Sequence, residues 1–111
     1  MHSNELPDLY FSSVQGRDID RFVSLFAEDA VMILPDGSEV SGVAAIREME
    51  LRVFESSSPP SPTPVSIVAD DGSVAVEIDV RLPSGQVLKM ASFFQLNGEG
   101  HIQRLSIYRK G

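Results

Sequence analysis

The sequence predicts an α+β fold in which three N-terminal helices pack on a curved, mainly antiparallel β-sheet. Three observations support this. Apolar residues recur at helical spacing in the first half, apolar and polar residues alternate in the second half, and three turn motifs give consistent strand registers. The 111 residues suit a single domain spanning residues 1–111. Hydrophobic residues make up 42% of the chain and charged residues 23%, so a folded core is expected.

The first helix is expected to begin at Ser3 or Asn4, either of which can cap it, with Pro7 in its first turn. Gly16 should end it. Its apolar positions recur near helical spacing: Leu6, Tyr10 and Val14. These positions form the face that should pack on the sheet.

Asp18 can cap a second helix. One face of that helix is apolar: Ile19, Phe22, Val23 and Phe26. The following run AVMIL, residues 30–34, is too short for a helix and suits a strand, and the Pro-Asp-Gly sequence at 35–37 turns the chain. Glu28 and Asp29, between helix and strand, are interpreted as capping or turn residues.

A third helix is expected from Ser41 to about Phe54. Its apolar stripe is Ile46, Met49 and Val53. The proline-rich segment 56–64 is interpreted as a stiff connector to the sheet, because a helix cannot continue into consecutive prolines. Its PxxP spacing leaves a polyproline ligand as the alternative.

Three turns set the registers of the second half. Asp71-Gly72 suits a two-residue type I′ hairpin. A three-residue loop has Gly85 in the left-handed conformation, and a four-residue loop follows Leu96. The predicted partners are Ile67 with Val76, Val65 with Ile78, Val80 with Leu88, Asp79 with Lys89, Ser92 with Leu105, and Met90 with Ile107.

Because side chains alternate across a strand, these registers divide the sheet into two faces. The inner, apolar face should carry Val74, Val76, Ile78, Val80, Leu88, Met90, Ser92, Phe94, Leu105, Ile107 and Arg109. The outer face should carry Glu77, Asp79, Arg81, Lys89, Arg104 and Tyr108. The helices must cover the inner face, and a small curved sheet of this kind commonly leaves a pocket at its open end.

Composition excludes several classes of protein. The absence of cysteine excludes disulfides, thiolate catalysis and zinc–thiolate sites. A formal charge of −7 argues against a nucleic-acid partner, which clustered cations would bind. No basic and apolar leader begins the sequence, and no apolar run approaches the ~20 residues that span a bilayer. We therefore expect a cytoplasmic protein without a membrane, metal or cofactor partner.

Three segments carry a family resemblance: AEDAV (27–31), SGVAAIRE (41–48) and GHIQRLSIY (100–108). With them, the chain from about Leu6 to Arg109 resembles the NTF2-like superfamily, and within it the ketosteroid isomerases and SnoaL-like polyketide cyclases. The resemblance implies a cone-shaped α+β barrel with an apolar cavity, often as a homodimer. It implies no single reaction, because this fold serves isomerases, cyclases, hydrolases, dehydratases and binding modules.

Ketosteroid isomerases use an aspartate base, a tyrosine donor and a protonated carboxylic acid. In this sequence the resemblance places the tyrosine donor at Tyr10, the base at Leu34 and the acid at Ser92. Leucine cannot transfer a proton, and a serine hydroxyl is a weaker donor than a carboxylic acid. The standard isomerase mechanism is therefore disfavoured.

The predicted ligand-binding residues face the interior: Tyr10, Phe26, Met32, Leu34, Met49, Met90, Ser92, Leu105, Ile107 and Arg109. Tyr10 and Glu50 are the candidate catalytic residues, Glu50 as a displaced base at the cavity rim. The alternatives are a backbone-bonded core tyrosine and a solvent-exposed glutamate. Ser92 suits either a hydrogen bond within the sheet or a ligand contact. Arg109 either favours a carboxylate or enolate ligand or lies in solvent.

These residues support three functions. The first is a domain that binds a small apolar, polyketide-like or steroid-like molecule. The second is an isomerase- or cyclase-type enzyme that uses Glu50 or a water molecule as its base, and the third is a protein-interaction module. The outer sheet face also carries Ala75, Ala91 and Phe93, more apolar than a free surface requires, so we expect homodimerisation there.

Overall fold

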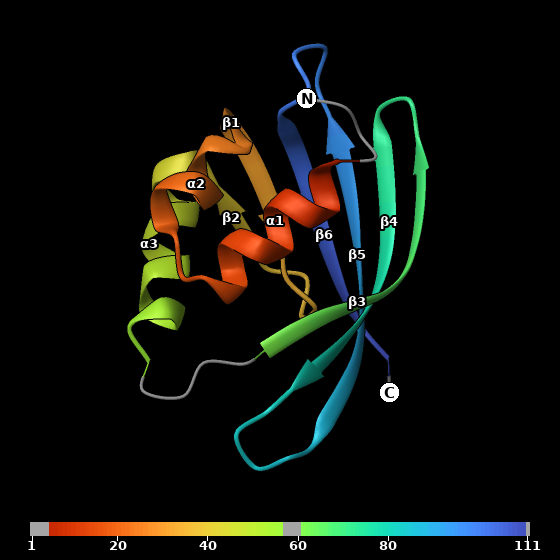
Figure 1. Ribbon diagram of the computed structural model, residues 1–111. Coiled ribbons are helices and arrows are strands. Elements are labelled where there is room, and N and C mark those ends of the chain that lie inside the picture. Colours follow the sequence, from red (N-terminus) through yellow and green to blue (C-terminus); the bar gives the residue numbers. More distant parts are fainter. Residues whose placement is uncertain (1–4, 57–60, 111) are drawn as a thin grey trace.

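The computed structural model describes residues 5–56 and 61–110, which form three helices and a six-stranded sheet (Figure 1). The helices lie together on one face of the curved sheet, as predicted. The strand order is β2-β1-β6-β5-β4-β3, antiparallel throughout except for the parallel pair β1–β6. In chain order the elements are α1 (Leu6–Gln15), α2 (Ile19–Ser24), β1 (Phe26–Ile33), β2 (Glu39–Ser41), α3 (Val43–Phe54), β3 (Ser61–Asp70), β4 (Ser73–Arg81), β5 (Val87–Leu96) and β6 (Ile102–Arg109).

The first two helices lie where the sequence predicts them. The expected caps Ser3 and Asn4 fall outside the described residues, and α1 starts after Glu5 without a side-chain cap. The Asp18 carboxylate accepts a hydrogen bond from the backbone N–H of Arg21 at 3.2 Å, which confirms the predicted cap of α2.

Strand β1 is longer than expected, and Phe26 belongs to it rather than to α2. The backbone N–H of Ile102 donates to the Leu25 carbonyl, and Phe26 pairs with Ile102 on β6. Pairing with a distant strand thus overrides the helical periodicity that placed Phe26 on the helix. Glu28 and Asp29 consequently lie within β1, exposed, and not at a helix cap.

A short strand that the sequence did not indicate, β2, precedes the third helix. Ser41, the expected start of that helix, pairs with Val31 instead. Gly42 has a φ of 89°, a positive value that glycine adopts readily and that separates β2 from the helix. Helix α3 therefore begins at Val43.

Strand β3 takes up residues 61–64 of the predicted connector, whereas residues 57–60 lie outside the described part. Pro62 and Pro64 are tolerated because β3 is an edge strand, where a missing N–H need not break the ladder. Ile67 pairs with Val76 as predicted. The predicted pairing of Ile78 with Val65 is wrong: Ile78 pairs with Pro64, since the register shifts between Pro64 and Ser66.

The β4–β5 register is confirmed, with Val80 opposite Leu88 and Asp79 opposite Lys89. The Lys89 ammonium and the Asp79 carboxylate lie 2.7 Å apart. Gly85 has a φ of 92°, the left-handed conformation that the loop requires. The turn at Asp71-Gly72 has two residues as expected, but it is not type I′, because among described non-glycine residues only Arg17 has a positive φ.

The predicted β5–β6 register is wrong by two residues. Ser92 pairs with Ile107 rather than Leu105, and Met90 pairs with Arg109 rather than Ile107. One residue of the error arises at the loop, since Leu96 pairs with Ile102, and the other at a bulge between Gln95 and Leu96. Within the loop, the Asn97 side chain accepts hydrogen bonds from the N–H groups of Glu99 and His101. A shift of two keeps every side chain on its predicted face.

The core lies between the helices and the inner face of the sheet. From the sheet, inner positions of β1, β4, β5 and β6 contribute Met32, Val74, Val76, Ile78, Phe94 and Leu105, all buried. From the helices come Leu6, Tyr10, Phe11, Phe22, Ile46 and Phe54. No helix in the described ranges is long and apolar enough to cross a membrane.

Candidate functional site

Tyr10 is the centre of an aromatic cluster on the inner side of the sheet. Its ring centroid lies 5.0 Å from those of Phe11 and Phe94 and 5.3 Å from that of Phe22. The side chain is only 8% exposed, yet its hydroxyl makes no hydrogen bond to another described residue. The alternative of a tyrosine bonded to the backbone is therefore wrong, and its O–H is available to a molecule from outside the chain.

Glu50 is a buried carboxylate on α3. It follows Ile46 and precedes Phe54 by four residues each, so these three side chains share the buried face of the helix. Glu50 is 9% exposed and has no hydrogen-bond or ion-pair partner among the described residues. The alternative of a solvent-exposed Glu50 is therefore wrong. Met49 and Val53, predicted to share the apolar face of α3 with Ile46, are only half-buried beside this line of residues.

Burial raises the pKa of Glu50 to about 7, because the charged carboxylate loses its hydration. The pKa of Tyr10 is raised well above its usual value, first by burial and then by the negative charge of Glu50. The two groups are thus close enough to interact electrostatically, and the tyrosine stays protonated. At neutral pH the carboxylate can both accept and return a proton, and the phenol can only donate a hydrogen bond.

Ser92 is the third buried polar side chain in this region. It is 5% exposed on the inner face of β5, two residues before Phe94, against which Tyr10 packs. Its hydroxyl makes no hydrogen bond to a described residue, so the expectation of a hydrogen bond within the sheet is wrong. We refer to Tyr10, Glu50 and Ser92 together as the inner polar set. Ser13 and Ser106 are the other buried polar side chains among the described residues, and the Ser13 hydroxyl donates to the Tyr10 carbonyl at 2.7 Å.

The other predicted ligand-binding residues lie around this set to different degrees. Met32, Phe26 and Leu105 are buried in the core, and Phe26 lies 6.4 Å from Tyr10 between ring centroids. The half-buried positions are Leu34, Met49, Met90 and Ile107. Leu34 lies just after β1 and packs against the core, as expected for the position where the resemblance places a base.

Arg109 is on the predicted face, opposite Met90 at the end of β6, but it is exposed. It forms no ion pair with a described residue. Its predicted contact with a ligand in the interior therefore finds no support in its position. Within the described ranges no group of three or more histidine, cysteine, aspartate or glutamate residues is arranged to hold a metal ion.

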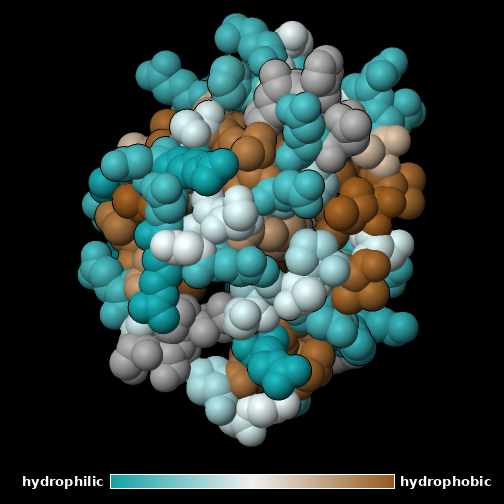
Figure 2. Space-filling view, in the orientation of Figure 1, coloured by the Kyte–Doolittle hydropathy of each residue, from teal (hydrophilic) through white to brown (hydrophobic). Residues whose placement is uncertain are grey.

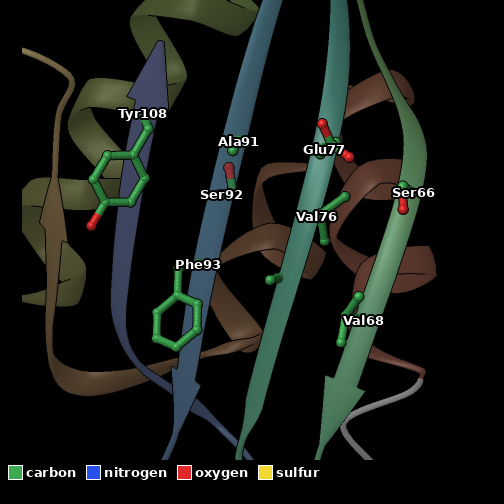
Figure 3. A pocket seen from close by; sticks show the side chains of 9 residues that line it. Ser66, Val68, Val76, Glu77, Ala91, Ser92, Phe93 and Tyr108 are labelled. Carbon is green, nitrogen blue, oxygen red and sulfur yellow. The ribbon is translucent and has the colours of Figure 1, made fainter. Parts of the chain in front are cut away.

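The outer face of the sheet bears a separate shallow hollow of about 380 Å³ (Figure 3). The rings of Phe93 and Tyr108 project from the neighbouring strands β5 and β6, and Val68 lies across the hollow on β3. Tyr108 is 59% exposed, a large apolar area for a free surface. Ser92 of the inner polar set also lines this outer hollow, although only 5% of Ser92 is exposed.

The sequence model of the SnoaL-like domain family matches residues 8–105. The chain belongs to this family. The match includes Tyr10, Glu50 and Ser92, so the inner polar set lies within the SnoaL-like domain. A search of curated proteins finds no match.

Solved structures with the same SnoaL-like (NTF2-like) fold include a candidate ketosteroid isomerase from Kribbella flavida. It is 24% identical to this chain with a TM-score of 0.87, over 98% of this chain and 78% of that one. A candidate polyketide cyclase from Sinorhizobium meliloti is 28% identical, with a TM-score of 0.77, over 96% and 99%. The epoxide hydrolase/cyclase-like enzyme SalBIII, of pyran ring formation in salinomycin, is 24% identical, with a TM-score of 0.82, over 97% and 90%.

Proposed function

We propose that this SnoaL-like domain binds a small, largely apolar molecule of the polyketide or steroid-like class between its helices and the inner face of its sheet. The observation that carries the proposal is the inner polar set: Tyr10, Glu50 and Ser92 are largely buried and make no hydrogen bond or ion pair with another described residue. No fully buried side-chain nitrogen or oxygen atom in the described part of the chain lacks a partner, so the polar atoms of these three side chains remain accessible to a small molecule. A ligand that seals these atoms from solvent must supply partners for them, because an unpaired buried polar group costs about 1–3 kcal/mol, and a charged one costs more. A ligand with oxygen atoms in an apolar ring system would satisfy all three.

A thermal-shift screen tests this proposal. We expect at least one compound from a panel of steroid ketones and fused-ring polyketide acids to raise the Tm. A ligand at ten times its Kd stabilises the folded state by about 1.4 kcal/mol. The Ser92→Ala variant, which removes the hydroxyl without adding volume, should lose part of that shift. Uniformly absent shifts would contradict the proposal and favour a protein-interaction module.

Acid–base catalysis is the second candidate function, because a buried carboxylate with a pKa near neutrality suits proton transfer. Glu50 would remove a proton from the carbon next to a ligand carbonyl and return it to another carbon. Tyr10 would donate a hydrogen bond to the carbonyl oxygen as negative charge develops there. Glu50 would thus replace the base missing at Leu34, which makes the reaction isomerase- or cyclase-like.

We also propose that two copies dimerise through the outer sheet face, around the outer hollow. Phe93 and Tyr108 supply aromatic side chains of the kind that dominate protein interfaces. The neighbouring positions Ala75 and Ala91 are small and would let two sheets approach closely. Glu77 is the one charged residue that lines the hollow, and the neighbouring Asp79 is paired with Lys89.

Sedimentation at tens of micromolar should show a dimer of the wild-type protein. Tyr108→Lys should weaken dimerisation about 30-fold or more, as loss of a central aromatic side chain at an interface does. Tyr108→Phe, which keeps the ring, should remain dimeric. A monomeric wild type, or a dimer insensitive to Tyr108→Lys, would contradict this arrangement.

A further inference from the structure

The middle of edge strand β3, residues 65–68, carries an unusual concentration of exposed apolar side chains. Val65, Ile67 and Val68 are 63%, 44% and 68% exposed. These are three of the six exposed large hydrophobic side chains among the described residues, within four consecutive positions. Figure 2 shows apolar side chains at the edge of the molecule that β3 forms in Figure 1. Such an edge invites pairing with another strand.

Dimerisation through the outer face would not cover this edge completely. Val68 lines the outer hollow, so a partner on that face would bury it. Ile67 pairs with Val76, whose side chain is buried in the core. Because paired residues share a face of the sheet, the Ile67 side chain lies on the inner face, away from the outer hollow. The second half of β3 also curves away from the helices (Figure 1), which leave Ile67 exposed. Ile67 therefore needs a different explanation.

The backbone of this segment is also open to pairing. The prolines that blunt the edge, Pro62 and Pro64, lie only in the first half of β3. Asp70 and Ser73 flank the two-residue turn to β4, where the two closing residues form a hydrogen-bonded pair. From there, hydrogen-bonded and non-hydrogen-bonded pairs alternate along an antiparallel ladder. Ile67 and Ala69 therefore direct their N–H and C=O groups away from β4, toward the free edge.

We propose that a second copy of this chain adds its β3 antiparallel to this edge, with the two-fold axis at Ile67. Ile67 then faces the partner's Ile67, and Val65 faces the partner's Ala69. Ser66 faces the partner's Val68, so the segment is complementary to itself.

Charge favours a second copy as the occupant. Residues 61–69 carry no charge in a chain of net charge −7, so two copies meet at this edge without local repulsion. The edge is independent of the inner polar set and of the outer hollow's aromatic residues.

The absence of cysteine makes a disulfide test clean. We compare the full chain carrying Ile67→Cys, Val65→Cys or Val87→Cys, each oxidised at the same micromolar concentration and followed on non-reducing gels. Facing residues of a hydrogen-bonded antiparallel pair have Cα atoms about 5.5 Å apart, within disulfide range. Two Val65 positions would lie about 14 Å apart along the paired strands.

We expect Ile67→Cys to form the cross-linked dimer at least about tenfold faster than either control, because pairing raises the local thiol concentration. Random collision would favour Val65→Cys instead, since Val65 is the more exposed position. Equal rates, or a faster Val65→Cys or Val87→Cys, would overturn the proposal. Circular dichroism verifies that each variant folds. The advantage of Ile67→Cys should persist in a Tyr108→Lys background, and its loss there would also contradict an independent edge contact.

Discussion

Glu50→Gln is expected to slow turnover of any ketone that the protein accepts by about 10²–10⁴-fold at neutral pH, the usual contribution of a positioned acid–base group. The amide fills the same space but can neither accept nor return a proton. The loss should appear in kcat with little change in KM, because the apolar surroundings that hold the ligand are unaltered. This is the sharpest test that separates an enzyme from a binding domain.

The rate of the wild-type protein should rise with pH through about 7 and then level off, since Glu50 acts as a base only when ionised. Glu48→Gln is the matched control on the same helix, because the Glu48 side chain is 72% exposed. It should leave both the rate and the pH profile unchanged. Full activity in Glu50→Gln would exclude the catalytic role, while ligand binding by the same variant would leave the binding proposal standing.

The division of the sheet into two faces could be predicted from sequence because strand alternation tolerates register errors of two residues. The sequence predicts a partner for Ser92 two positions away from the observed one, yet it predicts the inward direction of Ser92 correctly. The error has two sources, a loop one residue longer than predicted between Leu96 and Ile102 and a bulge between Gln95 and Leu96. Turn signals in the sequence give the place of such a loop more readily than its length.

The strand boundaries near Phe26 and Ser41 could not be predicted, because partners distant in sequence decide them. Phe26 continues a helical apolar pattern, and pairing with Ile102 on β6 draws it into β1. The local sequence predicts a helix start at Ser41, but the pairing of Ser41 with Val31 makes it part of β2. Local propensity is a weak signal wherever a long-range strand partner exists.

Glu50 shows why the candidate site was only partly predictable. Glutamate residues on helices are mostly exposed to solvent, so residue type alone predicts an exposed side chain for Glu50. Its spacing of four residues from both Ile46 and Phe54 indicates the opposite. That spacing was the available signal, since it places Glu50 on the most buried line of α3. Tyr10 was easier to assign, because its helical position and the family resemblance agreed.

The free energy of unfolding of the wild-type protein should fall by about 3 kcal/mol, relative to Glu50→Gln, as pH rises from 4.5 to above 7. The pKa of Glu50 in the unfolded chain is near its ordinary 4.5, and burial raises it to about 7 in the folded state. Between these values the folded state holds the proton more tightly than the unfolded state. The penalty of burying the charge is therefore absent below pH 4.5 and complete above about 7.

Urea unfolding at fixed protein concentration, in steps from pH 4.5 to 8, measures this effect. Subtracting the free energy of unfolding of Glu50→Gln from that of the wild type cancels the contribution of every other titrating group that the substitution leaves undisturbed. Glu48→Gln, on the exposed face of the same helix, should give a difference that varies little with pH. A flat difference for Glu50 as well would mean that its charge is solvated in the folded state. The pKa near 7 would then be lost, and with it the argument for Glu50 as a base at neutral pH.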